Sequence, residues 1–308
     1  MKTAIIGAGA MGCFIGAMLS KAGNDVTMID VDKRVIDAIN ERGIHLELRG
    51  ESMHIPVKAS LAKDMTEKAE LAILFTKAAY SRAALEESSP YIGEDTYVLT
   101  MQNGLGNVEL LCEYFAEDRV IAAVTTYAGD VKGPAHTATN AKGYLKMMTA
   151  NGEMTETLVS IDKMLREAGL ESEICPDVMA VIWEKVAFNA AINATSALCR
   201  VPCGGMAVTE EGRSLVYKVA EETCRVAAAH GIYVDAEAVK GYLDIALTVQ
   251  AGHFTSMTQD LQNKRLTEAA FINGAIWKKA QEAGLEASYN ETMYALLHTV
   301  ESTYDMQK

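Results

Sequence analysis

Short apolar runs and helical segments alternate along the first part of the chain. The apolar runs are "KTAIIG", "DVTMID", "LAILFT", "TYVLT" and "VIAAVTT", and helical periodicity covers residues 10–22, 33–41, 79–89 and 155–168. Further extended pieces are expected at "IHLEL", "MHIPV", "HTATN" and "YLKMM". Apolar strands that alternate with helices predict a parallel sheet with crossover helices, which is a doubly wound α/β fold.

The later part of the chain has helical periodicity and no convincing strand. The expected helices span residues 177–198, 208–230, 236–251, 264–283 and 291–304. The change falls at "EICPDV", where Pro176 suits the first turn of a helix. We therefore predict two domains, an α/β domain over residues 1–175 and an all-α domain over residues 176–308.

A glycine-rich segment, "IIGAGAMG", connects the first predicted strand to the first predicted helix. In the dinucleotide-binding (Rossmann) fold, such glycines permit a tight turn, let the backbone approach a pyrophosphate and let the helix pack on the strand. The alternative is a set of glycines that only packs a strand–turn–helix unit. The expected cofactor-binding residues of this loop are Gly7, Ala8, Gly9, Ala10, Met11 and Gly12.

Asp30, at the end of the second predicted strand, is the candidate for cofactor choice. A carboxylate about 20 residues after the first glycine binds the ribose hydroxyls of NAD, and it would repel the 2′-phosphate of NADP. The sequence therefore favours NAD(H), although Lys33 and Arg34 leave NADP(H) open. The alternative is that Asp30 caps the helix that begins near Lys33.

Composition and charge narrow the class of partner. A net charge of −13 without any basic run argues against nucleic acid. Glycines interrupt the uncharged stretch 3–20, and no other stretch could cross a bilayer. Six scattered cysteines without a Cys-x-x-Cys pair indicate reduced thiols in a cytoplasmic protein. The six histidines have neither helical nor zinc-finger spacing, so we expect no metal site.

Two polar residues follow predicted strands, Lys77 after "LAILFT" and Asn103 after "TYVLT". Ligands of parallel sheets bind at the carboxyl ends of the strands, which makes both residues candidates for the site. The alternatives are a solvated lysine and an ordinary Asn-Gly turn.

A polar stripe of Lys185, Asn189 and Asn193 recurs every four residues within the mostly apolar "WEKVAFNAAINATS". On a helix the three side chains share a face, and buried amides need partners that a substrate could supply. Alternatively, the lysine reaches solvent and the amides cap neighbouring loops. Ser256 and Glu268, in "TSMTQDLQNKRLTEAAFING", are further candidates, although Glu268 could simply favour a helix dipole.

These motifs together resemble the ketopantoate reductase (2-dehydropantoate 2-reductase) family over essentially the full chain. The matching segments are "GAGAMG", "FTK", "QNGLGN", "WEKVAFNAAINATSAL" and "SMTQDLQNKRLTEAAFING". The resemblance implies a Rossmann domain followed by an all-helical substrate and catalytic domain. It also implies nicotinamide-dependent reduction of a branched 2-oxo acid to a D-2-hydroxy acid, as in pantothenate biosynthesis. A homodimer is compatible with it.

The resemblance also implies roles for single residues. Lys185 would donate a proton to the substrate carbonyl oxygen, and Glu268 would bind the substrate hydroxyl and help orient the lysine. Lys77 and Asn103 would line the nicotinamide and substrate side of the site. The implied substrate-binding residues are Asn103, Asn189, Asn193 and Ser256.

Two positions depart from the family pattern. Asp30 stands where NADPH-using members commonly carry a basic residue. Cys203, in Pro202-Cys203-Gly204, replaces an asparagine that contacts substrate, and a thiol cannot replace an amide's hydrogen bonds. The alternative is therefore an NAD-dependent D-2-hydroxy acid dehydrogenase of the same family, acting on another branched or aromatic 2-oxo acid. A non-catalytic nucleotide-sensing protein is a third hypothesis.

Overall fold

The chain, described over residues 1–140 and 142–307 by a computed structural model, divides into two compact units. The first unit consists of residues 1–102 and 107–178, and the second of residues 103–106 and 179–308. The segment Asn103–Gly106 thus belongs with the second unit, which the sequence did not indicate. None of the helices in the described ranges has the length and apolar character needed to cross a membrane.

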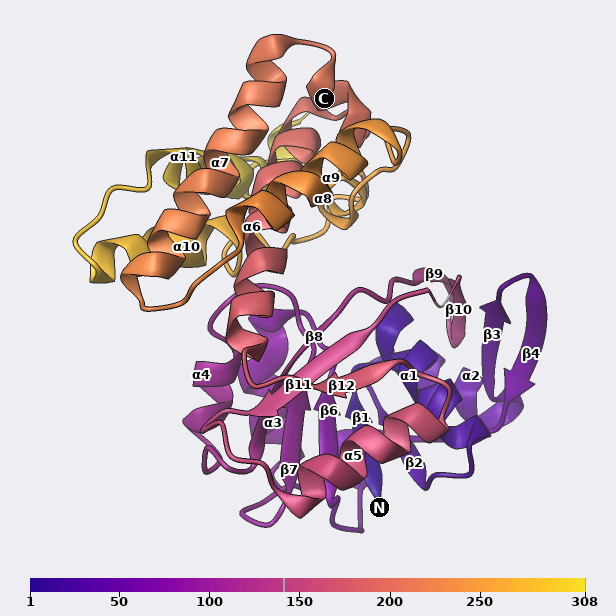
Figure 1. The fold of residues 1–308 in the computed structure, drawn as a ribbon. Helices are drawn as coiled ribbons and strands as arrows, with labels where there is room; N and C mark the ends of the chain where they lie inside the picture. The colour runs from indigo at the N-terminus through magenta and orange to yellow at the C-terminus, as the bar shows by residue number, and fades with distance from the viewer. Residues whose placement is uncertain (141, 308) are drawn as a thin grey trace. The chain divides into compact units, whose positions relative to one another are not determined.

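Eight strands form the main sheet of the first unit, in the order β12-β11-β8-β7-β6-β1-β2-β5 (Figure 1). Neighbouring strands are parallel except β8 and β11. The predicted α/β class is therefore confirmed, with one antiparallel pair and the short β12 added. The strands are β1 (Thr3–Ile6), β2 (Val26–Ile29), β5 (Lys58–Ser60), β6 (Leu71–Leu74), β7 (Tyr97–Thr100), β8 (Val120–Thr125), β11 (Leu145–Thr149) and β12 (Ser172–Ile174).

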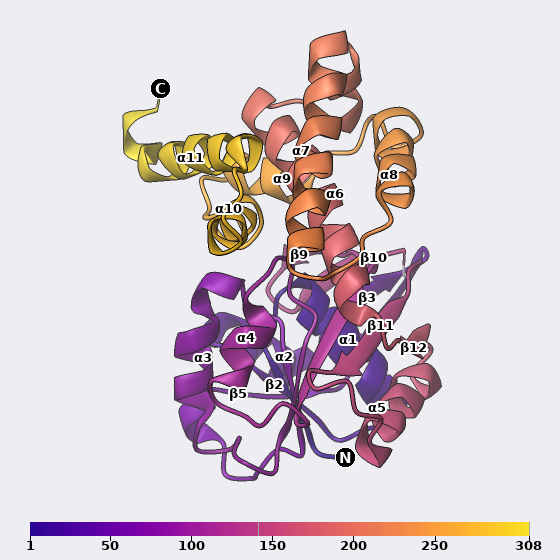
Figure 2. The ribbon, with the colours of Figure 1, turned by 60° about the vertical axis from the view of Figure 1, so that its left-hand side comes forward.

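Helices cover both faces of this sheet. Helices α1 (Ala10–Lys21) and α5 (Glu156–Glu167) lie on one face, and α3 (Ser81–Ser88) and α4 (Asn107–Cys112) on the other (Figure 2). Helix α1 buries most of its circumference because it contacts both β1–β2 and a second, smaller sheet. This double burial explains why its sequence is uncharged before Lys21.

The smaller sheet has the strand order β4-β3-β10-β9 and packs on α1. Its central strands pair in parallel, while the outer strands are antiparallel to their neighbours. The sequence predicted the extended pieces of β3, β4 and β10, but neither β9 nor their union in a separate sheet. The strands are β3 (Ile44–Leu48), β4 (Glu51–Ile55), β9 (Asp130–Gly133) and β10 (His136–Thr139).

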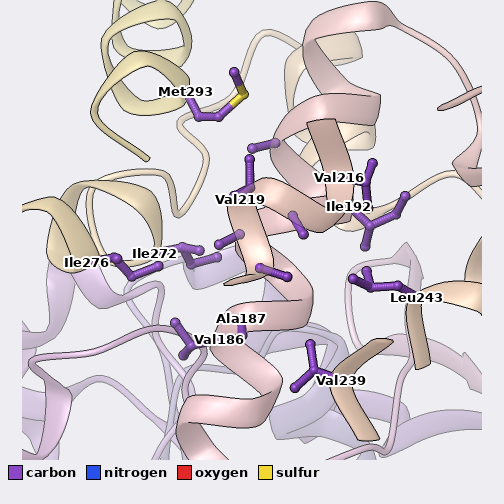
Figure 3. Close-up of a cluster of buried hydrophobic side chains, with 14 of the residues drawn as sticks. Val186, Ala187, Ile192, Val216, Val219, Val239, Leu243, Ile272, Ile276 and Met293 are labelled. Carbon is purple, nitrogen blue, oxygen red and sulfur yellow. The ribbon is translucent and has the colours of Figure 1, made fainter. Parts of the chain in front are cut away.

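The second unit is helical in its described residues, as predicted. Its longest helix, α6 (Val178–Cys199), is surrounded by apolar side chains of the other helices (Figure 3). Val219, Leu243 and Ile276 are among those that contribute to this core. The other helices are α7 (Glu210–Ala229), α8 (Ala236–Thr248), α9 (Ser256–Gln262), α10 (Asn273–Glu282) and α11 (Ser288–Ser302). The remaining helical elements of the described residues are α2 (Lys33–Arg42), the 3₁₀ turns η1 (Ala62–Asp64) and η2 (Ala78–Tyr80) of the first unit, and the 3₁₀ turns η3 (Cys203–Ala207) and η4 (Tyr304–Met306) of the second.

The prediction of one helix over residues 264–283 is wrong. Helix α9 ends at Gln262, and α10 begins at Asn273. Lys264 adopts a left-handed backbone conformation with φ of 51°, which a continuing α-helix does not allow. Glu268 therefore lies in the connection between two helices, and the alternative that it serves the dipole of a first helical turn is wrong.

Candidate functional site

The glycine loop after β1 requires glycine at two positions for steric reasons. Gly7 has φ of 105°, and a Cβ there would lie 2.8 Å from the backbone of Phe75 and Thr76. A Cβ on Gly12 would lie 1.9 Å from the Gly7 carbonyl oxygen. Around Gly9, by contrast, a Cβ would have nothing within 4 Å. This open space lets a ligand reach the loop and the N-terminus of α1, where backbone N–H groups favour an anion.

A cavity of about 380 Å³ opens beside this loop within the first unit, and its size suits a small organic ligand. Gly7, Gly9, Asp30 and Lys77 all line it, so four of the predicted cofactor-binding residues share one space. Lys77 precedes η2 directly. The remaining wall is largely apolar and includes Ile29, Val31, Ala62, Phe75, Tyr80, Ala83 and Ala84.

Asp30 is held by the backbone at the edge of this cavity. Its Oδ2 accepts the Ala8 N–H at 2.7 Å, and its Oδ1 accepts the Asp32 N–H at 2.9 Å. A carboxylate oxygen can accept a second hydrogen bond, so both remain able to bind hydroxyl groups. Asp32, not Asp30, is the N-cap of α2, and it accepts the Arg34 N–H. The alternative that Asp30 caps this helix is therefore wrong.

Arg34, the arginine that the sequence left open as a phosphate ligand, is engaged by Asp32. Its Nη2 donates to Asp32 Oδ2 at 2.7 Å, and its Nε donates to Oδ1 at 3.0 Å. This two-point contact raises the pKa of the guanidinium through the hydrogen bond and the charge of Asp32. A 2′-phosphate would have to compete with Asp32 for this arginine.

The polar stripe of the second unit lies on α6, as its spacing predicted. Lys185 is partly buried, and the exposed fractions of Asn189 and Asn193 are only 7% and 8%. Over residues 1–140 and 142–307, neither amide group makes a hydrogen bond to another residue. Two nearly buried amides in one row with Lys185 thus keep their hydrogen-bonding capacity for a ligand.

Lys185 and Glu268 form an acid–base pair in this unit. Burial lowers the pKa of the Lys185 amine from its usual 10.5 to about 8, and the negative charge of Glu268 opposes part of this shift. A lysine with such a pKa is mostly protonated at neutral pH and gives up its proton readily. These are the properties of an effective general acid.

Glu268 is bound in turn by Asn103, whose Nδ2 donates to Glu268 Oε2 at 2.9 Å. The neighbouring backbone secures this contact, because the Leu105 N–H donates to the Phe271 carbonyl oxygen at 2.7 Å. Gly104 is required here, since a Cβ would lie 2.4 Å from that same oxygen. The structure therefore brings together Asn103 and Glu268, which the sequence had placed in different motifs.

Buried asparagines connect α6 to the helix that follows Glu268, and the sequence analysis missed them. Asn273 Nδ2 donates to the Ala190 carbonyl oxygen at 3.2 Å and to Asn290 Oδ1 at 3.0 Å. The Asn290 amide donates to Glu222 Oε1 at 2.9 Å. Asn273 lies within the segment "TSMTQDLQNKRLTEAAFING", and it is the completely buried first residue of α10. An asparagine directly after the apolar run "AAFI" is the sequence signal that could have identified it.

Two further predicted residues, Ser256 and Cys203, lie at the starts of helical elements in the second unit. Ser256 is exposed at the first position of α9, after the N-cap Thr255. Cys203, where the family carries an asparagine, is buried at the start of η3. Burial raises the pKa of its thiol. The Cys203 side chain is therefore a small neutral group at this position.

Known protein families match both the α/β unit and the helical unit of this chain. Residues 3–152 match the family described as ketopantoate reductase PanE/ApbA, and residues 177–301 match its C-terminal domain. A 2-dehydropantoate 2-reductase of Streptococcus pyogenes is 32% identical over 311 residues, which cover all of both chains.

Two solved structures have the same fold along the whole chain. One is a ternary complex of D-mandelate dehydrogenase with NADH and anilino(oxo)acetate, with a TM-score of 0.93 and 27% identity, covering 99% of this chain and 100% of that one. The other is a putative 2-dehydropantoate 2-reductase of Enterococcus faecalis, with a TM-score of 0.78 and 28% identity over 99% of each chain.

Proposed function

We propose that this chain, which belongs to the ketopantoate reductase family, reduces the ketone of 2-dehydropantoate or a similar branched 2-oxo acid to a D-2-hydroxy acid. The observation that carries this proposal is the α6 stripe. A lysine with a pKa of about 8, on which the charge of Glu268 acts, lies on the same helix face as two nearly buried amides. The chain is an oxidoreductase that acts on CH–OH groups, as are its relatives.

The chemistry follows from the charges that develop during reduction. The glycine loop and Asp30 would hold the nicotinamide dinucleotide, which would supply a hydride to the carbonyl carbon, so that negative charge would build up on the carbonyl oxygen. The Lys185 ammonium stabilises this charge and delivers its proton to the oxygen, which completes the hydroxyl group. Glu268 holds the lysine and accepts a hydrogen bond from the substrate hydroxyl. The amides of Asn189 and Asn193, together with Ser256, bind the substrate carboxylate without adding a further titratable group.

We also propose that the cofactor is NADH rather than NADPH. Lys77 and Asn103 complete the cofactor-binding set with the glycine loop and Asp30. Two arrangements support this choice: Asp30 has free lone pairs at the cavity edge, and Asp32 engages Arg34. A ribose diol can donate to Asp30, whereas a 2′-phosphate would be repelled by two carboxylates and would have to compete with Asp32 for the charged Arg34 guanidinium.

A second candidate is oxidation and reduction of another D-2-hydroxy acid, in particular an aromatic one. Two observations favour it. Cys203 offers no amide to a hydroxylated substrate such as 2-dehydropantoate, and the structural similarity to D-mandelate dehydrogenase is high. A small thiol at this position leaves room for a larger apolar group.

Initial rates with 2-dehydropantoate, 2-oxoisovalerate and phenylglyoxylate, each with NADH and with NADPH, test these proposals. The highest kcat/KM with 2-dehydropantoate supports the first proposal, and a lower value than with every other acid overturns it in favour of the second. Cofactor binding without turnover of any acid would identify the non-catalytic alternative.

We further propose that the chain works as a homodimer in the cytoplasm. An exposed apolar row along α8 and its C-cap residue supports self-association: Tyr242, Ile245 and the C-cap Val249 are 47%, 46% and 80% exposed. Their spacing places them along one side of the helix. Light scattering after gel filtration should give twice the mass of the 33.3 kDa chain. A concentration-independent monomer mass would contradict this proposal.

A further inference from the structure

Three histidines from three adjacent strands form a stack on the second sheet of the first unit. His45 on β3 pairs in register with His54 on β4 and with His136 on β10. The ring centroids of His45 and His136 lie 3.8 Å apart, and those of His45 and His54 lie 4.5 Å apart. Sequence spacing alone does not reveal this cluster, because the histidines come together only through strand pairing.

A carboxylate completes the group. Glu47 lies two positions after His45 on β3 and so shares its face of the sheet. Glu47 Oε1 lies 2.8 Å from His136 Nε2, although the two residues are 89 positions apart in the chain. One ligand atom from each of His45, Glu47 and His136 lies within 4.8 Å of the others. The opposite face of β3 buries Ile44 and Leu46, which anchors the strand.

We propose that His45, Glu47 and His136 bind a divalent transition-metal ion, with Zn²⁺ as the best match. Two imidazoles and one carboxylate are a ligand set that suits Zn²⁺ and leaves a fourth position for water. Neighbouring ligand atoms of a tetrahedral zinc ion lie roughly 3.3 Å apart, as follows from bond lengths of about 2.0 Å. The lone pairs of an imidazole lie in the ring plane, and the His45 and His136 rings are stacked with 18° between their planes. Binding one ion therefore requires these rings to turn about their side-chain bonds, and both side chains are partly exposed.

The surroundings favour a bound cation. The His45 ring is oriented by Ser52, whose Oγ lies 2.7 Å from His45 Nε2, as second-layer groups orient metal-binding imidazoles. The chain's net charge of −13 also attracts cations.

The competing description is a cross-strand ring stack with one His–Glu ion pair, which only stabilises the sheet. The full chain, without a polyhistidine tag, is treated with EDTA and then titrated with Zn²⁺ in a calorimeter. This titration distinguishes the proposed metal site from the ring stack that only stabilises the sheet. We expect one ion per chain, and visible d–d bands when Co²⁺ replaces Zn²⁺. His136→Gln and Glu47→Gln should each weaken binding by more than about tenfold, since even second-layer losses reach that size.

His298→Gln is the matched control, because His298 is exposed on α11 in the other unit. It should bind Zn²⁺ like the unmodified chain. Saturating Zn²⁺ should also raise Tm in the unmodified chain and in the control but not in His136→Gln. The proposal is overturned if the unmodified chain takes up no stoichiometric Zn²⁺, or if both ligand variants bind it with unchanged affinity. These experiments measure Zn²⁺ binding and thermal stability. Their results therefore do not depend on whether the chain has the proposed reductase activity.

Discussion

Asn103 donates a hydrogen bond of 2.9 Å to Glu268, which lies 165 positions later in the chain. Glu268 in turn favours the charged form of Lys185. The Asn103 amide thus holds the Glu268 carboxylate, whose charge raises the pKa of the proposed proton donor Lys185. Proton transfer, substrate binding and cofactor choice are assigned to different residues, so each can be tested by a separate substitution.

Replacing the lysine tests proton transfer most directly. Lys185→Ala should lower kcat by about 10²–10⁴-fold, the usual contribution of a general acid, while cofactor binding persists. Stopped-flow or steady-state rates on the substrate that the panel selects provide the measurement. Lys218→Ala, an exposed position on α7, is the matched control and should keep full activity. A loss of less than tenfold for Lys185→Ala would contradict the assigned role.

The pH dependence should report the lysine itself. Since its pKa is about 8, the protonated form is present below pH 8 and is lost as the pH rises through that value. The kcat/KM for reduction should therefore fall above about pH 8, and that for oxidation of the hydroxy acid should rise there. In Glu268→Gln the break should move to lower pH, because the carboxylate no longer favours the ammonium. A break at the same pH in both proteins would show that Glu268 does not act on the lysine.

The two amides of α6 should contribute to substrate binding rather than to the chemical step. Asn189→Ala and Asn193→Ala should each raise KM about tenfold, the effect of one lost hydrogen bond to a charged group. The dissociation constant of the cofactor, measured by fluorescence, should stay constant. A drop in kcat at unchanged KM would instead place these residues in the reaction step.

Cofactor choice should depend on the two aspartates after β2. Asp30→Ala should narrow the preference for NADH, because it removes the acceptor for the ribose hydroxyls. Asp32→Ala releases Arg34 and should improve kcat/KM with NADPH more than with NADH. The ratio of kcat/KM values for the two cofactors is the measurement. If Asp30→Ala leaves this ratio constant, Asp30 does not bind the ribose.

Local patterns predicted the features that depend on neighbouring residues. The glycine loop, the positions of the main strands along the chain and the α6 stripe all follow from short-range spacing. The α/β class and the helical character of the second unit are confirmed for the same reason. The domain limits of 1–175 and 176–308 stay predictions, as do the roles assigned to single residues.

Contacts between distant segments could not be predicted in this way. The pairing of Asn103 with Glu268 and of Asn273 with the Ala190 carbonyl oxygen depends on tertiary packing. The same holds for the histidine cluster, since strand order in the second sheet decides which rings meet. Helical periodicity also continued through residues 264–272, where the left-handed Lys264 backbone interrupts the helix.

The placement of Asn103–Gly106 has a consequence for how the protein is made. The chain passes between its two units at residues 102–103, 106–107 and 178–179. Leu105 is synthesised long before Phe271, yet its N–H donates to the Phe271 carbonyl oxygen and its side chain joins the core around α6. Until the ribosome has synthesised the later helices, the segment Asn103–Gly106 lacks the residues that it contacts in the folded protein. The capture of this early loop by late helices therefore takes place only after Phe271 has been synthesised.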